Sequence, residues 1–227
     1  MSMTRVTPIL VGGFVVSLGC AHQQATEVSQ EQLAHVRPQD MSGVNLARAA
    51  LARASDRVAR EDLALKSAQK EVDVANQQTR VAQAEIDRST EVLKKAELDR
   101  SGTASAQRQL NLYRAQLTAA QAQAISAKSQ SDLAAGKKAE AEAERDLAKS
   151  QLDWEEYEAL ARTGDPSAKN VDANGIQARI AEQKKRVDEE RSNVAQYKAA
   201  ADRDRAAWTS TKESYNALRG VGGAGER

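Results

Sequence analysis

The fold is decided by residues 44–96, which read VNLARAALARASDRVAREDLALKSAQKEVDVANQQTRVAQAEIDRSTEVLKKA. Small or apolar residues return here at alternating spacings of three and four. The first heptad position is occupied by Val44, Leu51, Val58, Leu65, Val72, Thr79, Ile86 and Leu93. The second is occupied by Ala47, Ala54, Glu61, Ala68, Ala75, Ala82, Ser89 and Ala96. One large and one small residue per heptad predict a long coiled-coil helix whose alanines favour close antiparallel packing.

The first interruption of this repeat is Ser101-Gly102-Thr103. Glycine favours the end of one helix, and serine or threonine favours the start of the next. We therefore expect the chain to reverse here, because glycine inside a helix costs about 1 kcal/mol. The reversal would pair Leu93 with Leu110, Ile86 with Leu117, Thr79 with Ala124, Ala82 with Ala120, and Ala75 with Ala127. A continuous helix is the alternative, since the leucines after the glycine also continue the Ala96 series.

A second long helix is expected from Leu110 to Thr163, with a change of phase near Gly136. Gly164 and Pro166 predict its end, and the loop continues to Gly175. Asp172 or Asn174 can cap a third helix that runs to about Arg219. The heptad series of that helix is Ile180, Val187, Val194, Ala201, Trp208 and Tyr215. Folding back at the loop would place Trp208 opposite about Gln130, where Ala127, Ser131, Ala134 and Ala135 leave room for an indole.

These patterns together predict an all-α fold, an elongated antiparallel coiled coil or helical hairpin of two or three long helices. No alternating or β-branched run predicts a strand. Aromatic residues make up 3% of the chain, so the buried surface should be a narrow seam rather than a thick core.

The composition argues against several classes of function. The 33 basic and 32 acidic residues are interspersed, so no basic stripe indicates a nucleic-acid partner. Cys20 is the only cysteine, and the two histidines, His22 and His35, precede the helical body. We therefore expect no catalytic site, no metal site and no cofactor, and the protein should not be an enzyme.

Two groups of side chains in the helical body have a functional and a structural interpretation. The carboxylates Glu140, Glu142, Glu144, Glu155, Glu156 and Glu158 can bind cations, but a solvated face is the favoured interpretation. The aromatic residues Tyr113, Trp154, Tyr157, Tyr197, Trp208 and Tyr215 can form a binding patch, but packing between helices is favoured.

The N-terminus has the pattern of a secretory signal, with Arg5 followed by an apolar run over Ile9–Leu18. Its end, Ser17-Leu18-Gly19-Cys20, resembles the lipobox of bacterial lipoproteins. This resemblance implies cleavage between Gly19 and Cys20 and lipidation of Cys20. Ala21 follows the cysteine where that family's inner-membrane signal has aspartate, which implies the outer membrane, facing the periplasm. The alternative is an ordinary signal peptide in which the cysteine stands by chance.

The expected organisation has four parts. Residues 1–19 form the signal peptide, and residues 20–40 form the lipidated N-terminus with a polar tether, for which flexibility is favoured over a short weak helix. Residues 41–219 form the coiled-coil domain, and residues 220–227 form a flexible tail containing four glycines.

These features predict a non-enzymatic, membrane-anchored envelope lipoprotein that acts as a coiled-coil scaffold, spacer or partner-binding module. Its expected partners are the bilayer, through acylated Cys20, other envelope proteins, through the helices, and a second copy of the chain. A regulator of a cell-wall enzyme is a further possibility, although no residue identifies such a partner.

The main alternative comes from Gly102-Thr103-Ala104-Ser105 and the following Leu110 and Leu117, which resemble the hairpin tip of efflux-pump periplasmic adaptor proteins. In that family the tip docks against an outer-membrane channel. The resemblance implies an accessory role in envelope transport or secretion, carried by a hairpin tip. The lipoyl and β-barrel domains of that family have no counterpart in this sequence, so only docking through the tip is implied.

Overall fold

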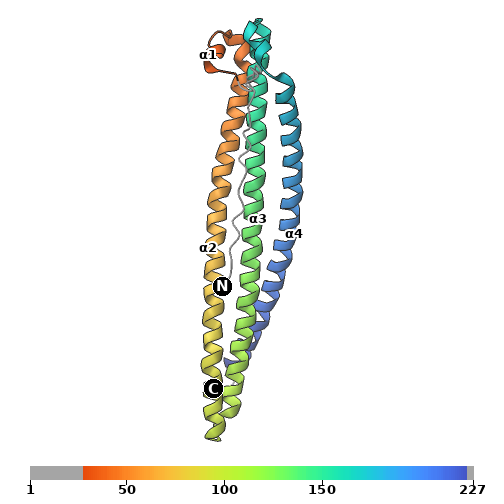
Figure 1. Cartoon of the computed structure of the whole chain (residues 1–227). Helices are drawn as coiled ribbons and strands as arrows, with labels where there is room; N and C mark the ends of the chain where they lie inside the picture. The colour runs from red at the N-terminus through yellow and green to blue at the C-terminus, as the bar shows by residue number, and fades with distance from the viewer. Residues whose placement is uncertain (1–27, 224–227) are drawn as a thin grey trace, which may run out of the picture.

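The computed structural model describes residues 28–223, which form a rod of three long helices (Figure 1). These helices are α2 (Ser42–Leu98), α3 (Thr103–Thr163) and α4 (Ala173–Gly223). The short helix α1 (Gln30–Leu33) and the 3₁₀ helices η1 (Pro38–Met41) and η2 (Pro166–Asn170) gather at one end, here called the cap end. The part of the chain that the structure describes contains no strand, so the all-α expectation is confirmed.

The helix α3 lies in the middle of the rod. Both α2 and α4 pack along it, whereas α2 and α4 do not pack along each other (Figure 1). The three helices therefore do not enclose a common core along their whole length. Two seams, one on each side of α3, hold the rod together.

The reversal between α2 and α3 is confirmed, and its geometry differs from the expected one. Asp99 is the C-cap of α2, and Arg100 takes the left-handed conformation that follows it, with φ of 52°. Ser101 N–H donates to Ala96 C=O at 3.1 Å, and Arg100 N–H donates to Glu97 C=O at 3.3 Å. This is a Schellman motif with arginine at the position that usually holds glycine.

Gly102 was expected to end the first helix, but it is the N-cap of α3, with φ of 70°. Two left-handed residues so close together reverse the chain within a few residues. The hydroxyl of Thr103 donates to Ala96 C=O at 3.4 Å across the turn. The distal end of the hairpin, residues 98–103, is here called the tip.

The register of α2 against α3 follows the predicted pairing. Gln116 donates to Glu85 at 2.7 Å, and Lys138 Nζ lies 2.7 Å from Asp62. Ala82 and Ala120 line one hollow, as expected for facing alanines. The residue numbers in these pairs add up to nearly the same value along the hairpin, as an uninterrupted antiparallel pair requires.

The cap end contains the main apolar cluster, and it corrects the expectation of a polar tether. Residues 28–41 are packed rather than extended away from the rod, and Ser29 and Gln32 form a capping box around α1. The buried members of the cluster are Val28, Leu33, Val36, Val44, Ala159, Leu160, Val171 and Ile176. Three of them precede η1 and stand as single apolar residues in a mostly polar segment, which is why the sequence did not indicate a hydrophobic contact. Residues 20–27 lie outside the described part of the chain.

The second connection, between α3 and α4, forms as the sequence predicts. Gly164 ends α3 with φ of 72°. Asp165 accepts hydrogen bonds from the hydroxyl and N–H of Ser167, which hold the pKa of its carboxyl below the ordinary value. Asp172 caps α4 by accepting from Gly175 N–H at 2.9 Å.

The register of α4 differs from the expected one by about one turn. Trp208 lies level with Gln123 and Ser126 of α3 rather than with Gln130. The reason is the short connection: the 3₁₀ turn η2 and the buried Val171 bring the chain back sooner than an open loop would. The helix also continues to Gly223, past the expected end at Arg219, and residues 224–227 lie outside the described range.

Candidate functional site

The predicted lipidation and cleavage residues, Cys20 and Gly19, lie outside the described residues. The described chain begins at Val28, which is buried in the apolar cluster of the cap end. The structure therefore locates the point at which the N-terminal segment joins the rod, and that point is the cap end rather than the tip.

The acidic residues of α3 form a layer of ion pairs across the rod, contrary to the expectation of a solvated face. Glu140 and Glu144 have side chains that are only 12% and 23% exposed. Arg57 of α2 binds both, at 3.4 Å from Glu140 and in close contact with Glu144. Arg191 of α4 also binds both, at 3.5 Å and 3.2 Å. These two carboxylates therefore connect α2 to α4 through α3, and the four residues are here called the arginine bridge.

Heptad spacing could not identify the arginine bridge. Glu140 and Glu144 are separated by one helical turn, which is equally typical of a solvent-facing stripe. Only the arrival of a third helix beside α3 shows that an arginine from each neighbour meets them. Glu156, at the other end of α3, is likewise buried and lies 3.1 Å from Arg48.

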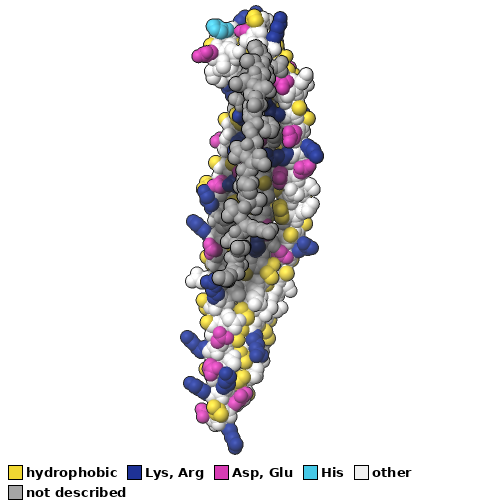
Figure 2. Space-filling view, in the orientation of Figure 1, with side chains coloured by type: hydrophobic (Ala, Val, Ile, Leu, Met, Phe, Trp, Pro, Cys, Tyr) yellow, Lys and Arg dark blue, Asp and Glu magenta, His cyan; other side chains and the backbone are white. Residues whose placement is uncertain are grey.

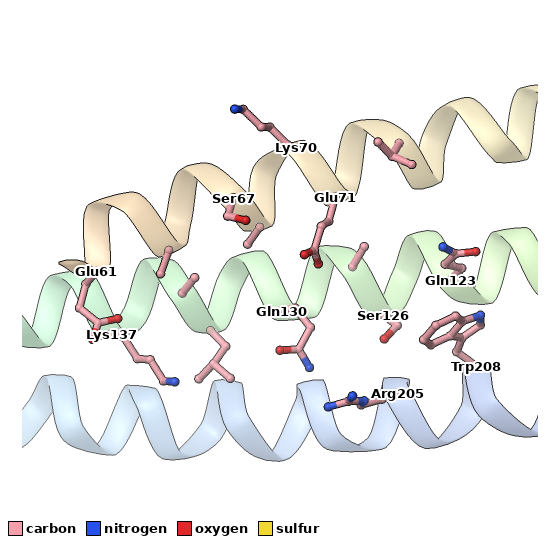
Figure 3. A pocket seen from close by; sticks show the side chains of 16 residues that line it. Glu61, Ser67, Lys70, Glu71, Gln123, Ser126, Gln130, Lys137, Arg205 and Trp208 are labelled. Atoms are coloured by element: carbon pink, nitrogen blue, oxygen red, sulfur yellow. The ribbon is translucent and has the colours of Figure 1, made fainter. Parts of the chain in front are cut away.

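A groove follows α3 on the side that faces both neighbouring helices. Its largest hollow, here called the central hollow, has a volume of about 710 Å³ and lies between the arginine bridge and Trp208 (Figure 3). It is lined from all three helices by Glu61, Ala64, Ser67, Ala68, Lys70, Glu71, Val74, Gln123, Ser126, Ala127, Gln130, Leu133, Ala134, Lys137, Arg205 and Trp208. Smaller hollows of about 580 Å³ and 460 Å³ lie above and below it, and the same three helices line them.

The residues that line these hollows are typical of packing between helices rather than of a small-molecule binding site. The α3 residues of the central hollow recur at spacings of three and four, as they do along one face of a helix. Most are alanine, serine or glutamine, and no histidine or cysteine is among them. In the described part of the chain there is no group of three or more His, Cys, Asp or Glu side chains that could hold a metal ion.

Apart from Lys70, the charged residues that line the central hollow are arranged by sign. Glu61 and Glu71 belong to the α2 wall, and Lys137 and Arg205 belong to the wall formed by α3 and α4. None of these four forms an ion pair or side-chain hydrogen bond with another described residue. Figure 3 shows Glu71 reaching into the hollow, whereas Lys70 turns away from it. The groove thus has an acidic wall and a basic wall that do not meet.

The aromatic residues do not gather in one patch. Trp154 and Tyr157 lie beside the apolar cluster of the cap end, with their ring centroids 5.4 Å apart. Trp208 lines the groove, and the Lys212 ammonium lies 5.4 Å from its ring centroid. Tyr197 packs over Gly136 of α3. The packing interpretation fits the first pair and Tyr197, and Trp208 belongs to the groove.

The surface of the rod is mixed in character, as Figure 2 shows: basic and acidic side chains alternate along it, with apolar side chains between them. At the tip, Leu98 is 82% exposed, which is the largest exposure among the large apolar residues of the described chain. Within the described range, no helix is both long and apolar enough to cross a bilayer.

Comparisons of this chain with family models, with curated proteins and with solved structures found no significant match.

Proposed function

We propose that this protein is a non-enzymatic lipoprotein of the bacterial cell envelope, anchored through acylated Cys20, whose helical rod acts as a spacer and partner-binding scaffold. The sequence Ser17-Leu18-Gly19-Cys20 after a short apolar run carries the proposal. Acyl chains on the new N-terminal cysteine would anchor the protein firmly, since each buried methylene contributes about 0.8 kcal/mol. Ala21 after the cysteine favours the outer membrane, with the rod in the periplasm.

The geometry of the rod supports a spacer with a defined direction. The segment between Cys20 and Val28 spans at most about 28 Å when fully extended. Because Val28 is buried at the cap end, an anchor at Cys20 would hold that end close to the membrane. The 57 residues of α2 then carry the tip about 85 Å away along the rod. The cap end is thus the membrane-proximal end, and the tip is available to a distant partner.

The adaptor-like alternative, docking through the tip, is favoured by one observation. Leu98 is a large apolar residue at the turn between two long helices, and it is almost entirely exposed. An apolar side chain at the end of a rod is well placed to enter a pocket of another protein. The expected result is that Leu98→Glu leaves the helical content unchanged and abolishes copurification with an envelope channel.

The anchoring proposal is tested by replacing Cys20 with serine in the native bacterium. We expect the substituted protein to lose metabolic labelling with a fatty acid and to leave the detergent phase for the aqueous phase. Ser17→Ala is the matched control, because it changes the same segment and keeps the cysteine. Continued acylation of the Cys20→Ser protein would overturn the lipoprotein proposal, and so would a normally processed Cys20→Ser protein that stays membrane-bound.

A further inference from the structure

The central hollow leaves the space between α2 and α4 open in the middle of the rod. Above it, the arginine bridge links α2 to α4 through ion pairs; below it, Trp208 lines both the central hollow and the next, smaller hollow of the groove. Between these two levels, α2 and α4 are separated, and the alanines and serines of α2 and α3 form the floor and one wall. Small residues at these positions let another helix approach closely.

The large apolar residues of α2 at this level are incompletely covered. Leu65 and Val72 belong to the heptad seam, yet neither is fully buried against α3. On the rim of the groove, Val74 is 52% exposed, and Val81, one heptad further along, is 51% exposed. The rim therefore offers apolar surface beside a floor of small residues, which is the lining that a helix interface requires.

The charged residues on the two walls of the central hollow indicate what kind of surface can bind there. The acidic wall carries Glu61 and Glu71, separated by ten residues of α2, or about 15 Å. On the opposite wall, Lys137 lies beside the level of Tyr197, because Gly136 contacts that ring, and Arg205 follows eight residues later, or about 12 Å. The two walls thus carry opposite charges at nearly the same spacing and at the same two levels of the rod.

We propose that the central hollow is the self-association surface of this protein and faces the same hollow of a second copy, with α2 of each copy beside α4 of the other. In a two-fold dimer whose axis runs parallel to the rod, the acidic α2 wall of each copy lies opposite the basic wall of the other, so the surface is complementary to itself. The Glu61 and Glu71 carboxylates of each copy then pair with Lys137 and Arg205 of the other, and Val74 of each copy packs at the rim of the partner's groove. Both walls belong to this chain, so a second copy supplies the complement that the unpaired charges need.

The experiment is sedimentation equilibrium of the full chain carrying Cys20→Ser, which removes both the acylation site and the thiol. The expected mass is twice the 24.5 kDa of the chain. Lys137→Glu with Arg205→Glu gives the groove two acidic walls and should weaken the dimer at least about tenfold. Glu61→Lys with Glu71→Lys gives it two basic walls and should do the same. An equimolar mixture of the two variants should restore a dimer that contains one chain of each kind.

The matched control is Arg108→Glu with Arg203→Glu, the same change of charge at exposed positions of α3 and α4 that do not line the groove. This variant should remain dimeric, and circular dichroism should show that all variants keep their helices. A wild-type chain that is monomeric at every concentration would overturn the proposal, as would a dimer that survives both reversals, or variants that fail to associate on mixing. The test does not depend on lipidation, so its failure leaves the anchoring proposal untouched.

Discussion

At the scale of the residue, Gly136 is a point of close contact between α3 and α4. A Cβ at this position would lie 2.7 Å from the Tyr197 ring of α4, which is closer than carbon atoms normally approach. The glycine therefore lets α4 pack against α3 where any side chain would hold the helices apart. From the sequence, Gly136 weakens a predicted helix; in the structure, it is a contact position for the third helix.

Arg100 shows the opposite case, in which the expected glycine is absent. It takes the left-handed conformation with φ of 52°, which usually disfavours residues that have a Cβ. The Schellman hydrogen bonds from Arg100 and Ser101 hold this conformation in place. The sequence predicted the turn because of Gly102, although the residue that ends α2 in the left-handed conformation is Arg100.

Asp62 should make the stability of the hairpin sensitive to acid. Hydrogen bonds from Lys138, then from Lys66, lower the pKa of its carboxyl from 3.8 to about 2. Because the folded-state pKa lies below the unfolded one, this stabilisation is complete above about pH 4 and is lost as the pH falls through about 2. Urea unfolding measured across this range should show a smaller acid-induced loss in Asp62→Asn than in the wild type.

The control for this prediction is Asp73→Asn, which removes an exposed carboxylate from the same helix. The direct measurement is an NMR titration of the Asp62 carboxyl. A midpoint near 3.8 in the folded protein would contradict the assignment of the ion pairs between Asp62 and the two lysines.

At the scale of the element, α4 is held against α3 by few buried apolar side chains and by several ion pairs. Over its 51 residues, the buried apolar side chains among those described are Ile176, Val187 and Ala201. Its ion pairs with α3 lie toward the cap end, where Arg179 contacts Asp153 at 3.1 Å and Arg186 contacts Asp146 at 3.2 Å. The position of α4 is therefore set by a few charged contacts and by close packing at Gly136.

The arginine bridge should contribute measurably to the attachment of α4. We expect Glu140→Gln with Glu144→Gln to lower the free energy of unfolding by about 1–2 kcal/mol, since the carboxylates are mostly buried but both arginines are partly exposed. Denaturant unfolding measures this difference, which should shrink in high salt because screening weakens the wild-type ion pairs.

Glu91→Gln is the control for the arginine bridge. Glu91 pairs with Lys94 at 2.7 Å, but both side chains are well exposed to solvent, so the change should lower the stability much less than the double substitution does. An equal effect of the two substitutions would show that Glu140 and Glu144 behave as surface residues and that the bridge does not hold α4.

At the scale of the whole molecule, the three antiparallel helices predict the dimensions of a single rod in solution. The 61 residues of α3 span about 90 Å, and the cap end and tip add little to this length. Small-angle scattering from the full chain carrying Cys20→Ser should give a maximum dimension of about 90–130 Å, allowing for the terminal segments. A chain in which α2 and α3 formed one continuous helix would extend over about 180 Å, and such a value would contradict the hairpin.

The periodicity of residues 44–96, the glycines at 102 and 164 and the candidate caps near Asp172 favour two or three long antiparallel helices without reference to the structure. These features are local, because helix formation, capping and reversal depend on residues within a few positions of one another. The same local rules predict the pairing of α2 with α3, since a tight turn sets the register of a hairpin.

Only the tertiary structure shows in which register α4 packs against α3, because that register depends on contacts between residues far apart in the chain. An alanine-rich seam has little shape to select one register over another, so the buried Val171, the approach of Tyr197 to Gly136 and the arginine pairs set the position of α4. The burial of Val28, Leu33 and Val36 was hidden for the same reason: each is an isolated apolar residue in a polar segment until Leu160 and Ile176 come beside it. The groove and its opposed charges exist only because α2 and α4 pack on different sides of one helix.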